Sequence, residues 1–463
     1  MKKRLKKYNS LYVRLVLLHI GIGFGIYLFR FLGTVYFMAS VAYFIYFIFK
    51  NGNRQNQALV AAAYMTGGEV VFRMTSTIIP WETGKYSVIS FLLIGLFLSG
   101  TSRKSAPYWL YLVLLLPGVI YAATTLNFDT DVRKAIAFNL SGPVCLGIAA
   151  LYCYDRRITK IQLQQVLWAI IMPTVTMATY LYFYTPGTQE VLNGTASNFA
   201  LSGGFGPNQV ATILGLGMFA LFVQVFINTR NKWIFSINLL LLMLLTYRAI
   251  LTFSRGGVLT ALIICVVFLF SYFQGISKTK KSTIMVYITV VAGAVLLVWF
   301  ITSIRTMGLI DLRYANKDAT GRVKENISTG RTELISSELV FFKENPIMGI
   351  GVGKTREYRE KKYGILAASH NELSRLLSEH GIFGLAALIL LILVPLSFRF
   401  SNRKNYLFYS FLGFWFLTIN HSSMRIAAPA FLYALSLINI IHEKKATLHR
   451  EQISAQGKFA YKH

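Results

Sequence analysis

The sequence predicts an all-α polytopic membrane protein: a bundle of about 12–14 transmembrane helices with one large outer (periplasmic) loop. Of its 463 residues, 55% are hydrophobic and only 14% are charged, whereas a soluble domain carries about a quarter charged residues. Apolar runs that reach the length of about 20 residues needed to cross a bilayer recur from end to end. They are too long, and alternate too seldom, for the strands of a membrane barrel.

The apolar runs give the predicted spans in chain order. These are residues 11–29, 32–49, 58–79, 86–100, 108–126, 136–153, 164–185, 207–228, 232–252, 257–274, 283–304, 371–398, 405–420 and 427–442. The first follows "MKKRLKK" and lacks a small-residue cleavage site, so it is interpreted as a retained helix and not as a removed signal peptide.

The charge distribution orients these spans. The net charge of +29 could indicate a nucleic-acid partner, but the basic residues lie on alternate connections, such as "YDRRITK", "NTRNK" and "GISKTKKS". Connections on the other side are mostly acidic or neutral, as in "PWETG" and "NFDTD". This is the positive-inside pattern. It predicts a cytoplasmic N-terminus and contact with anionic lipid, and not with nucleic acid.

The spans and loops divide the chain into five predicted parts. Residues 1–206 are N-terminal spans with short loops, 207–304 are central spans, 305–370 are a large periplasmic loop subdomain, 371–442 are C-terminal spans, and 443–463 are a basic cytoplasmic tail.

The stretch "NPIMGIGVGKTRE" (345–357) raises the question of a nucleotide site, because it ends in Gly-Lys-Thr after several glycines. The phosphate-binding loop G-x-x-x-x-G-K-[ST] needs its first glycine where this chain has Met348. The predicted topology also places the stretch outside the cytoplasm, away from ATP. The glycines are therefore predicted to form a tight backbone path.

Ionisable residues gather at the outer ends of the predicted spans, against the orienting bias and at a cost in free energy. This group consists of Glu69, Arg73, Arg248, Arg255, Arg331, His421 and Arg425. Glu69 and Arg73 are one helical turn apart and suit an internal ion pair. Arg248 and Arg255 would share a face if their helix continued to Ser254. Arg255 has no acidic residue nearby in sequence, which favours a functional role.

The stretch "SHNELSRLLSEHGIFG" (369–384) places His370 at the junction of the outer loop and a span. Asn371 or Ser369 is suited to cap the helix that follows. Arg375 is spaced for ion pairs with Glu372 and Glu379, which indicates a scaffold. A neutral imidazole at His370 can accept a proton.

The pattern H-N-x9-G-x-x-G in this stretch resembles the signature of the O-antigen ligase and O-antigen polymerase superfamily. Three further pieces agree in order: "GPNQVA" (206–211), "FSRGG" (253–257) and "TGRTELISSELVFFKENPIMGIGVG" (329–353). The resemblance covers roughly the C-terminal half of the chain, and the N-terminal spans are similar in topology only.

The resemblance implies a metal-independent glycosyltransferase that moves a glycan from undecaprenyl diphosphate to an acceptor hydroxyl, such as that of lipid A-core. It places the protein in the bacterial cytoplasmic (inner) membrane, with the active site on the periplasmic side. Arg255 and Arg331 would bind the diphosphate. His370 would take the acceptor proton, and its neutral range is expected to end near pH 6.5 unless nearby arginines lower it. Further predicted site residues are Arg248, Arg73, Asn371 and Arg425. No cofactor and no metal are expected.

Other functions remain open at this stage. A polymerase would use a second lipid-linked repeat unit as acceptor, and an oligosaccharyltransferase would use a protein. A lipid-linked glycan flippase or small-solute transporter would need polar residues through the bilayer midplane and repeat symmetry, whereas the charges here gather at one face.

Overall fold

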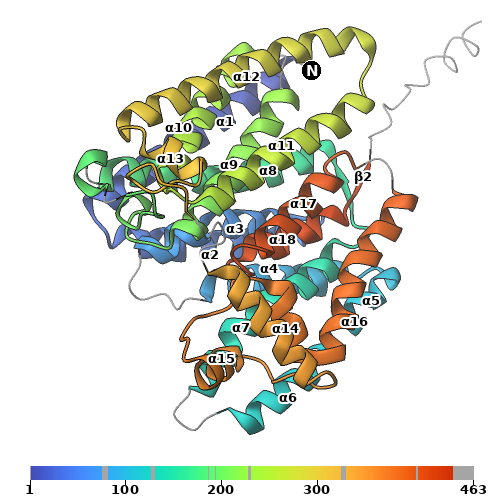
Figure 1. Cartoon of the computed structure of the whole chain (residues 1–463). Helices are drawn as coiled ribbons and strands as arrows, with labels where there is room; N and C mark the ends of the chain where they lie inside the picture. The colour runs from blue at the N-terminus through green and yellow to red at the C-terminus, as the bar shows by residue number, and fades with distance from the viewer. Residues whose placement is uncertain are drawn as a thin grey trace, which may run out of the picture.

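The computed structural model describes residues 2–75, 82–126, 131–185, 187–192, 194–227, 231–324, 330–402 and 405–441. Helices account for most of these residues (Figure 1). The elements are α1 (Lys2–Leu28), α2 (Leu32–Asn51), α3 (Gln57–Thr75), α4 (Thr83–Ser99), η1 (Arg103–Ser105), α5 (Ala106–Leu114), α6 (Leu116–Thr125), α7 (Val132–Cys153), β1 (Arg157–Thr159), α8 (Lys160–Tyr184), η2 (Thr188–Val191), η3 (Ala200–Ser202), α9 (Pro207–Ile227), α10 (Lys232–Leu251), α11 (Arg255–Gln274), α12 (Lys278–Arg305), α13 (Leu309–Tyr314), α14 (Arg331–Glu344), α15 (Thr355–Tyr363), α16 (Glu372–Ser401), α17 (Phe408–Ile419), α18 (Ala427–Ser436) and β2 (Asn439–Ile441).

The helices confirm the predicted class of all-α polytopic membrane protein. Within the described ranges, 10 helical segments are long and apolar enough to cross a membrane. The other predicted spans are also helical, as α3 and the shorter apolar helices α4, α17 and α18. The end of the third predicted span (76–79) and the basic tail (443–463) lie outside the described residues.

Two helices form the centre of the bundle. Nearly every residue of the apolar segments of α8 and α9 is buried, which explains why these helices are hydrophobic on all sides. α8 packs against α1, α3 and α9, and α9 packs against α10 and α11. α12 lies at the edge, against α10, and exposes most of its apolar surface (Figure 1).

The predicted spans 405–420 and 427–442 are shorter in the structure. α17 has 12 residues and α18 has 10, well below the length of about 20 needed to cross a bilayer. Hydrogen bonds explain the early end of α18, since the side-chain amides of Asn402 and Asn405 donate to the carbonyls of Ile438 and Ser436. The chain then becomes extended, and β2 pairs in parallel with β1.

The predicted outer loop contains three helices, α13, α14 and α15, which dock on two different helices of the bundle. α13 packs against the end of α12, whereas α14 packs against α16 (Figure 1). The prediction of a helix within "RTELISSELVFFKEN" is confirmed by α14. The loop thus brings its two ends to two different helices of the bundle.

The orientation of the bundle can be tested with impermeant maleimide on intact spheroplasts. In a cysteine-free background, Thr320→Cys is expected to be labelled, because Thr320 is exposed in the predicted outer loop. Lys281→Cys is expected to be labelled only after the membrane is permeabilised, since Lys281 is exposed in a basic connection. The reverse labelling pattern would invert the topology.

Candidate functional site

The "FSRGG" stretch forms a sharp turn between α10 and α11. α10 ends at Leu251, Phe253 has φ 54°, and α11 begins at Arg255. The helix therefore does not continue to Ser254, and Arg248 and Arg255 do not share a helix face. Ser254 Oγ donates to Asn208 Oδ1 at 2.7 Å, which ties this turn to the "GPNQVA" stretch.

Glycine is required where this turn meets its neighbours. A Cβ on Gly257 would lie 2.3 Å from the carbonyl carbon of Ala211 in α9, and one on Gly256 would lie 2.6 Å from Cδ2 of His421. Real Cβ atoms do not approach so closely. The two glycines thus let α11 pack directly on α9 and let the His421 ring lie against the start of α11.

The two arginines predicted to bind diphosphate each begin a helix. Arg255 is the first residue of α11 and Arg331 is the first residue of α14. Neither preceding residue, Ser254 or Gly330, caps its helix with a side-chain hydrogen bond. The helix dipole makes such N-termini favourable for negative charge, and α14 carries a carboxylate of its own, Glu333, in its first turn.

These arginines belong to a larger group of positive charges. Burial lowers the pKa of Arg331, and the charge of Arg255 lowers it further. Burial lowers the pKa values of Arg313, Arg425, His370 and His421, and the charge of Arg331 adds a smaller effect to each. Arg331 thus interacts electrostatically with both Arg255 and His370. We call these three residues, with Arg313, Arg425 and His421, the outer cationic site.

Arg313 was missed at the level of sequence. Its Nε donates to the carbonyl of Phe253 at 3.0 Å, and its own carbonyl accepts from Arg255 Nη1 at 3.3 Å. Because Arg313 lies in the short helix α13, 58 residues from Arg255, no helical spacing signals their contact. Its guanidinium attaches α13 to the turn that carries Arg255.

His370 lies at the edge of the outer cationic site. Its backbone carbonyl accepts from Ser423 N at 3.1 Å, which joins it to the turn between α17 and α18. Burial lowers the pKa of His370 to about 4, and the charges of Arg425 and Arg331 add to this effect. The imidazole is therefore neutral at pH 7. Within the described part of the chain, its buried Nδ1 has no hydrogen-bond partner.

His421 is a second neutral imidazole in the same place. Its Nδ1 lies 3.0 Å from the carbonyl of Leu417. Because a carbonyl only accepts, Nδ1 carries the proton and Nε2 keeps its lone pair. Burial lowers the pKa of His421 to about 4, although the contact with Leu417 opposes the shift.

The remaining predicted site residues make contacts that hold helices together. Arg73 donates to Glu69 and to the carbonyl of Arg425, each at 3.3 Å, and the predicted Glu69–Arg73 ion pair is confirmed. Arg248 donates to the carbonyl of Leu181 at 2.6 Å, at the end of α8.

Asn371 and Arg425 connect the two sides of the site. Asn371 caps α16, since its Oδ1 accepts from Leu373 N and Ser374 N, as predicted. Its Nδ2 also donates to Asn420 Oδ1 at 2.9 Å. Arg425 Nη2 donates to the carbonyl of Ser369 at 2.8 Å. These bonds position His370 beside His421.

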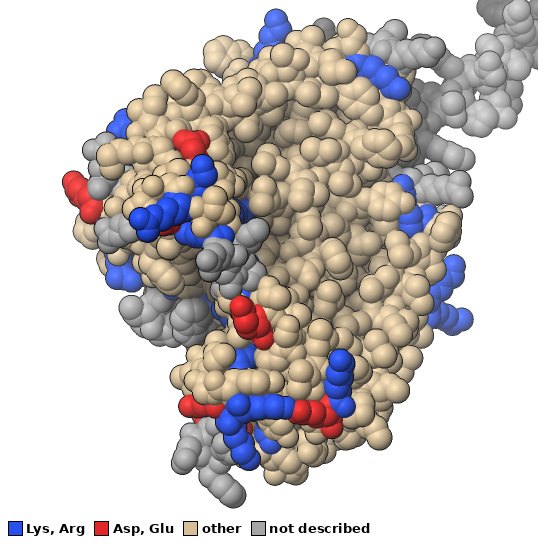
Figure 2. All heavy atoms as spheres, in the orientation of Figure 1, with Lys and Arg blue, Asp and Glu red and all other residues tan. Residues whose placement is uncertain are grey.

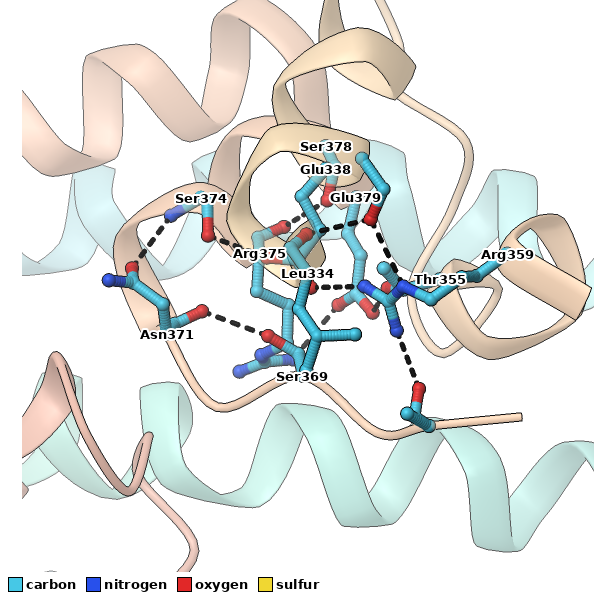
Figure 3. A network of polar contacts seen from close by, with 12 residues as sticks. Leu334, Glu338, Thr355, Arg359, Ser369, Asn371, Ser374, Arg375, Ser378 and Glu379 are labelled. Atoms are coloured by element: carbon cyan, nitrogen blue, oxygen red, sulfur yellow. Dashed lines mark hydrogen bonds and ion pairs between the residues drawn. The ribbon is translucent and has the colours of Figure 1, made fainter. Parts of the chain in front are cut away.

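A buried polar network holds the chain segments on both sides of His370 in place (Figure 3). Arg359 pairs with Glu338 at 2.6 Å and donates to the carbonyl of Ala367. Glu338 also accepts from Ser374 Oγ at 2.5 Å. Its pKa is raised by burial, against the opposing effect of these two donors. The network attaches α14 and α15 to the segment that leads into His370.

The glycine-rich stretch binds a carboxylate of the protein itself. Gly353 N and Thr355 Oγ1 donate to Glu379 Oε1 at 3.0 and 2.7 Å (Figure 3 shows the latter). The other carboxylate oxygen pairs with Arg375 at 2.9 Å, as the helical spacing predicted. The predicted tight backbone path is confirmed, with φ values of 68°, 93° and 83° at Gly349, Gly351 and Gly353.

The first glycine of H-N-x9-G-x-x-G, Gly381, lies where α16 is interrupted. It has φ 60° and ψ −136°. Ile382 N donates to the carbonyl of Pro346 at 2.8 Å instead of to its own helix. A Cβ on Gly381 would lie 2.4 Å from the carbonyl oxygen of Ile347. The break lets the Asn-Pro turn dock against α16.

Gly381→Ala is expected to lower thermal stability, by about 1–3 kcal/mol or more, because it combines an unfavourable φ with a steric overlap. Gly293→Ala is the matched control: Gly293 lies within α12, and a Cβ there would meet nothing within 4 Å. The melting temperature in detergent would measure both. Equal melting temperatures for the two variants would contradict the proposed role of Gly381.

The fold and the site define a multi-pass membrane protein with an arginine- and histidine-rich site at one end of its helices. Residues 239–389 match the family model described as O-antigen ligase, which confirms the predicted resemblance over that part of the chain. The match includes Arg255, Arg331 and His370, and supports lipid-linked glycan transfer of the ligase or polymerase type. No curated protein matches the chain.

Proposed function

We propose that this protein transfers a glycan from undecaprenyl diphosphate to an acceptor hydroxyl, with lipid A-core as the acceptor, at the periplasmic face of the inner membrane. The observation that carries the proposal is that Arg255 and Arg331 each begin a helix, with Arg331 within electrostatic range of both Arg255 and His370. A concentration of like charge is costly unless an anion binds it.

The arginines suit a diphosphate leaving group. Guanidinium groups bind phosphate oxygens through paired N–H donors and stay charged at every physiological pH. As the bond between the anomeric carbon and the diphosphate oxygen breaks, negative charge develops on that oxygen. Arg255 and Arg331 stabilise it in place, together with the positive ends of the helix dipoles of α11 and α14.

The acceptor hydroxyl attacks the anomeric carbon from the side opposite the diphosphate, which inverts the configuration. His370 accepts the hydroxyl proton, because burial and the neighbouring arginines keep its imidazole neutral. One carbon–oxygen bond forms, one breaks, and undecaprenyl diphosphate leaves with the electron pair.

The molecular surface offers a place for the polyprenyl chain. Figure 2 shows a hollow without charged side chains between the parts of the surface formed by α11 and α16 in Figure 1. Exposed apolar side chains lie on both helices, including Phe270 on α11 and Leu393 on α16. A lipid chain lying there would have its diphosphate at the end that carries Arg255.

The test is turnover by purified protein in proteoliposomes with a lipid-linked glycan donor. Covalent product is expected with lipid A-core, without an ion gradient and in the presence of EDTA. Within the described residues, no group of three His, Cys, Asp or Glu side chains is placed to hold a metal ion. Product formed only on a second lipid-linked repeat unit would show that the protein is a polymerase and not a ligase. Glycan movement across the bilayer without covalent product would exclude transfer.

A further inference from the structure

A cavity of about 500 Å³ lies at the opposite end of the helices from the outer cationic site. It is formed by the connections between α2 and α3, between α4 and η1, and between α7 and β1. Asn56 lines the cavity just before α3 begins, and Arg73 lies near the other end of that helix, a distance of about 25 Å at 1.5 Å per residue. The basic connections assign this end to the cytoplasm.

Three arginines line the cavity: Arg54, Arg156 and Arg157. The one carboxylate among the lining residues, that of Asp155, accepts a hydrogen bond from Asn439 at 3.1 Å. The lining therefore carries a net positive charge of two, in a concave site with hydroxyl donors at Thr101 and Ser102.

Arg156 forms a fixed wall of the cavity. Its guanidinium donates to the carbonyls of Tyr152 and Gly100 at 2.6 and 2.9 Å, and it lies over the Tyr152 ring at 3.8 Å. These contacts join the ends of α4 and α7. Arg54 and Arg157 are exposed at the cavity instead, so their planar N–H groups are accessible to a ligand.

We propose that this cavity binds the phosphate group of an anionic ligand, with Arg54 and Arg157 as the charged donors and Thr101 and Ser102 as hydroxyl donors. Guanidinium pairs and hydroxyls are the groups that recognise phosphate oxygens in proteins. The volume accommodates a phosphoglycerol headgroup.

The surroundings favour a phospholipid of the cytoplasmic leaflet as the source of this phosphate. Tyr46 and Phe49 on the last turns of α2 are 60% and 56% exposed, and Trp109 at the start of α5 is 54% exposed. Aromatic side chains at this depth lie at the headgroup level of a membrane. Acyl chains could pack against them while the phosphate occupies the cavity. Basic sites on the cytoplasmic side are attractive to anionic lipids.

The test compares ligands on the purified full chain in zwitterionic detergent. Phosphatidylglycerol is expected to raise the melting temperature saturably, whereas phosphatidylcholine is not. Arg54→Gln together with Arg157→Gln is expected to weaken the apparent affinity for phosphatidylglycerol by about tenfold or more, because two charge-assisted contacts are lost. Native mass spectrometry would count the retained lipid.

The matched control is Lys232→Gln together with Lys281→Gln, which removes the same charge from exposed positions at the same end of the bundle. It is expected to keep the affinity. Inorganic phosphate and glycerol phosphate form a second arm: a similar saturable effect from either would support the phosphate site and assign its source to a soluble anion. Equal lipid affinity in wild type and the Arg54/Arg157 variant, or an equal loss in the lysine control, would overturn the proposal.

Discussion

His370→Ala is expected to lower the rate of glycan transfer by about 10²–10⁴-fold, the usual contribution of a positioned general base. Donor binding is expected to change little, because His370 is proposed to act on the acceptor proton and not on the diphosphate. Turnover, donor affinity and melting temperature should be measured on the same preparation, since only the first is expected to fall sharply.

The pH dependence follows from the neutral form of the imidazole. Because the pKa of His370 is lowered to about 4, the imidazole is neutral above that pH and protonated below it. The kcat/KM value, which reports on the free enzyme, is expected to be constant between pH 7 and about 5 and to fall toward pH 4. This differs from the range near 6.5 expected of an isolated imidazole.

Bound donor should shift this profile. Its diphosphate would offset the positive charges of Arg425 and Arg331, which help to lower the pKa of His370. The kcat value is therefore expected to fall at a higher pH than kcat/KM does. If kcat and kcat/KM fall at the same pH, the bound diphosphate does not affect the pKa of His370.

His370→Gln distinguishes a base from a hydrogen-bonding residue. Glutamine keeps a donor and an acceptor but cannot take a proton at neutral pH. Transfer by this variant at close to the wild-type rate would refute the role of base. His421, whose Nε2 keeps its lone pair, would then be the next residue to test. His380→Gln serves as a control on a buried histidine of α16 and is expected to affect stability more than turnover.

Arg255→Lys and Arg331→Lys are each expected to lower transfer by about 10²–10³-fold, comparable to the loss of one preorganised donor to a developing oxyanion. Lysine keeps the charge but offers a point charge instead of a planar fork. Arg→Ala at either position is expected to lose more activity, and also donor affinity. Kinetics with a defined lipid-linked donor would separate the two effects.

The control for the arginine variants is Arg356→Lys. Arg356 is exposed on α15 and outside the outer cationic site, so near-normal transfer is expected. EDTA should leave wild-type turnover intact. Turnover that is lost on chelation and restored by Mg²⁺ would show that a metal ion, and not arginine, neutralises the leaving group.

Local patterns were sufficient to predict the helices and several contacts within them. Hydropathy located the apolar segments because a span must satisfy its own backbone hydrogen bonds within lipid. Asn371 was one of two candidate helix caps, because its side chain can accept from N–H groups of the first turn. The ion pairs of Arg375 followed from helical geometry, since residues three and four apart share a face. The spacing of Glu69 and Arg73 predicted their ion pair for the same reason.

Contacts between distant segments required the tertiary structure. Arg313 and His421 join the outer cationic site through packing of α13 and of the α17–α18 turn, and neither contact has a periodic signal in the sequence. The second oxygen of Glu69 accepts from Ala427 N at 2.6 Å, across most of the chain. The break at Gly381 depends on the Asn-Pro turn that docks there.

The sequence by itself therefore determined which segments are helical and which side chains are charged, because these follow from local composition. Only the tertiary structure decided which of those charges meet, because long-range packing sets the distances between helix ends.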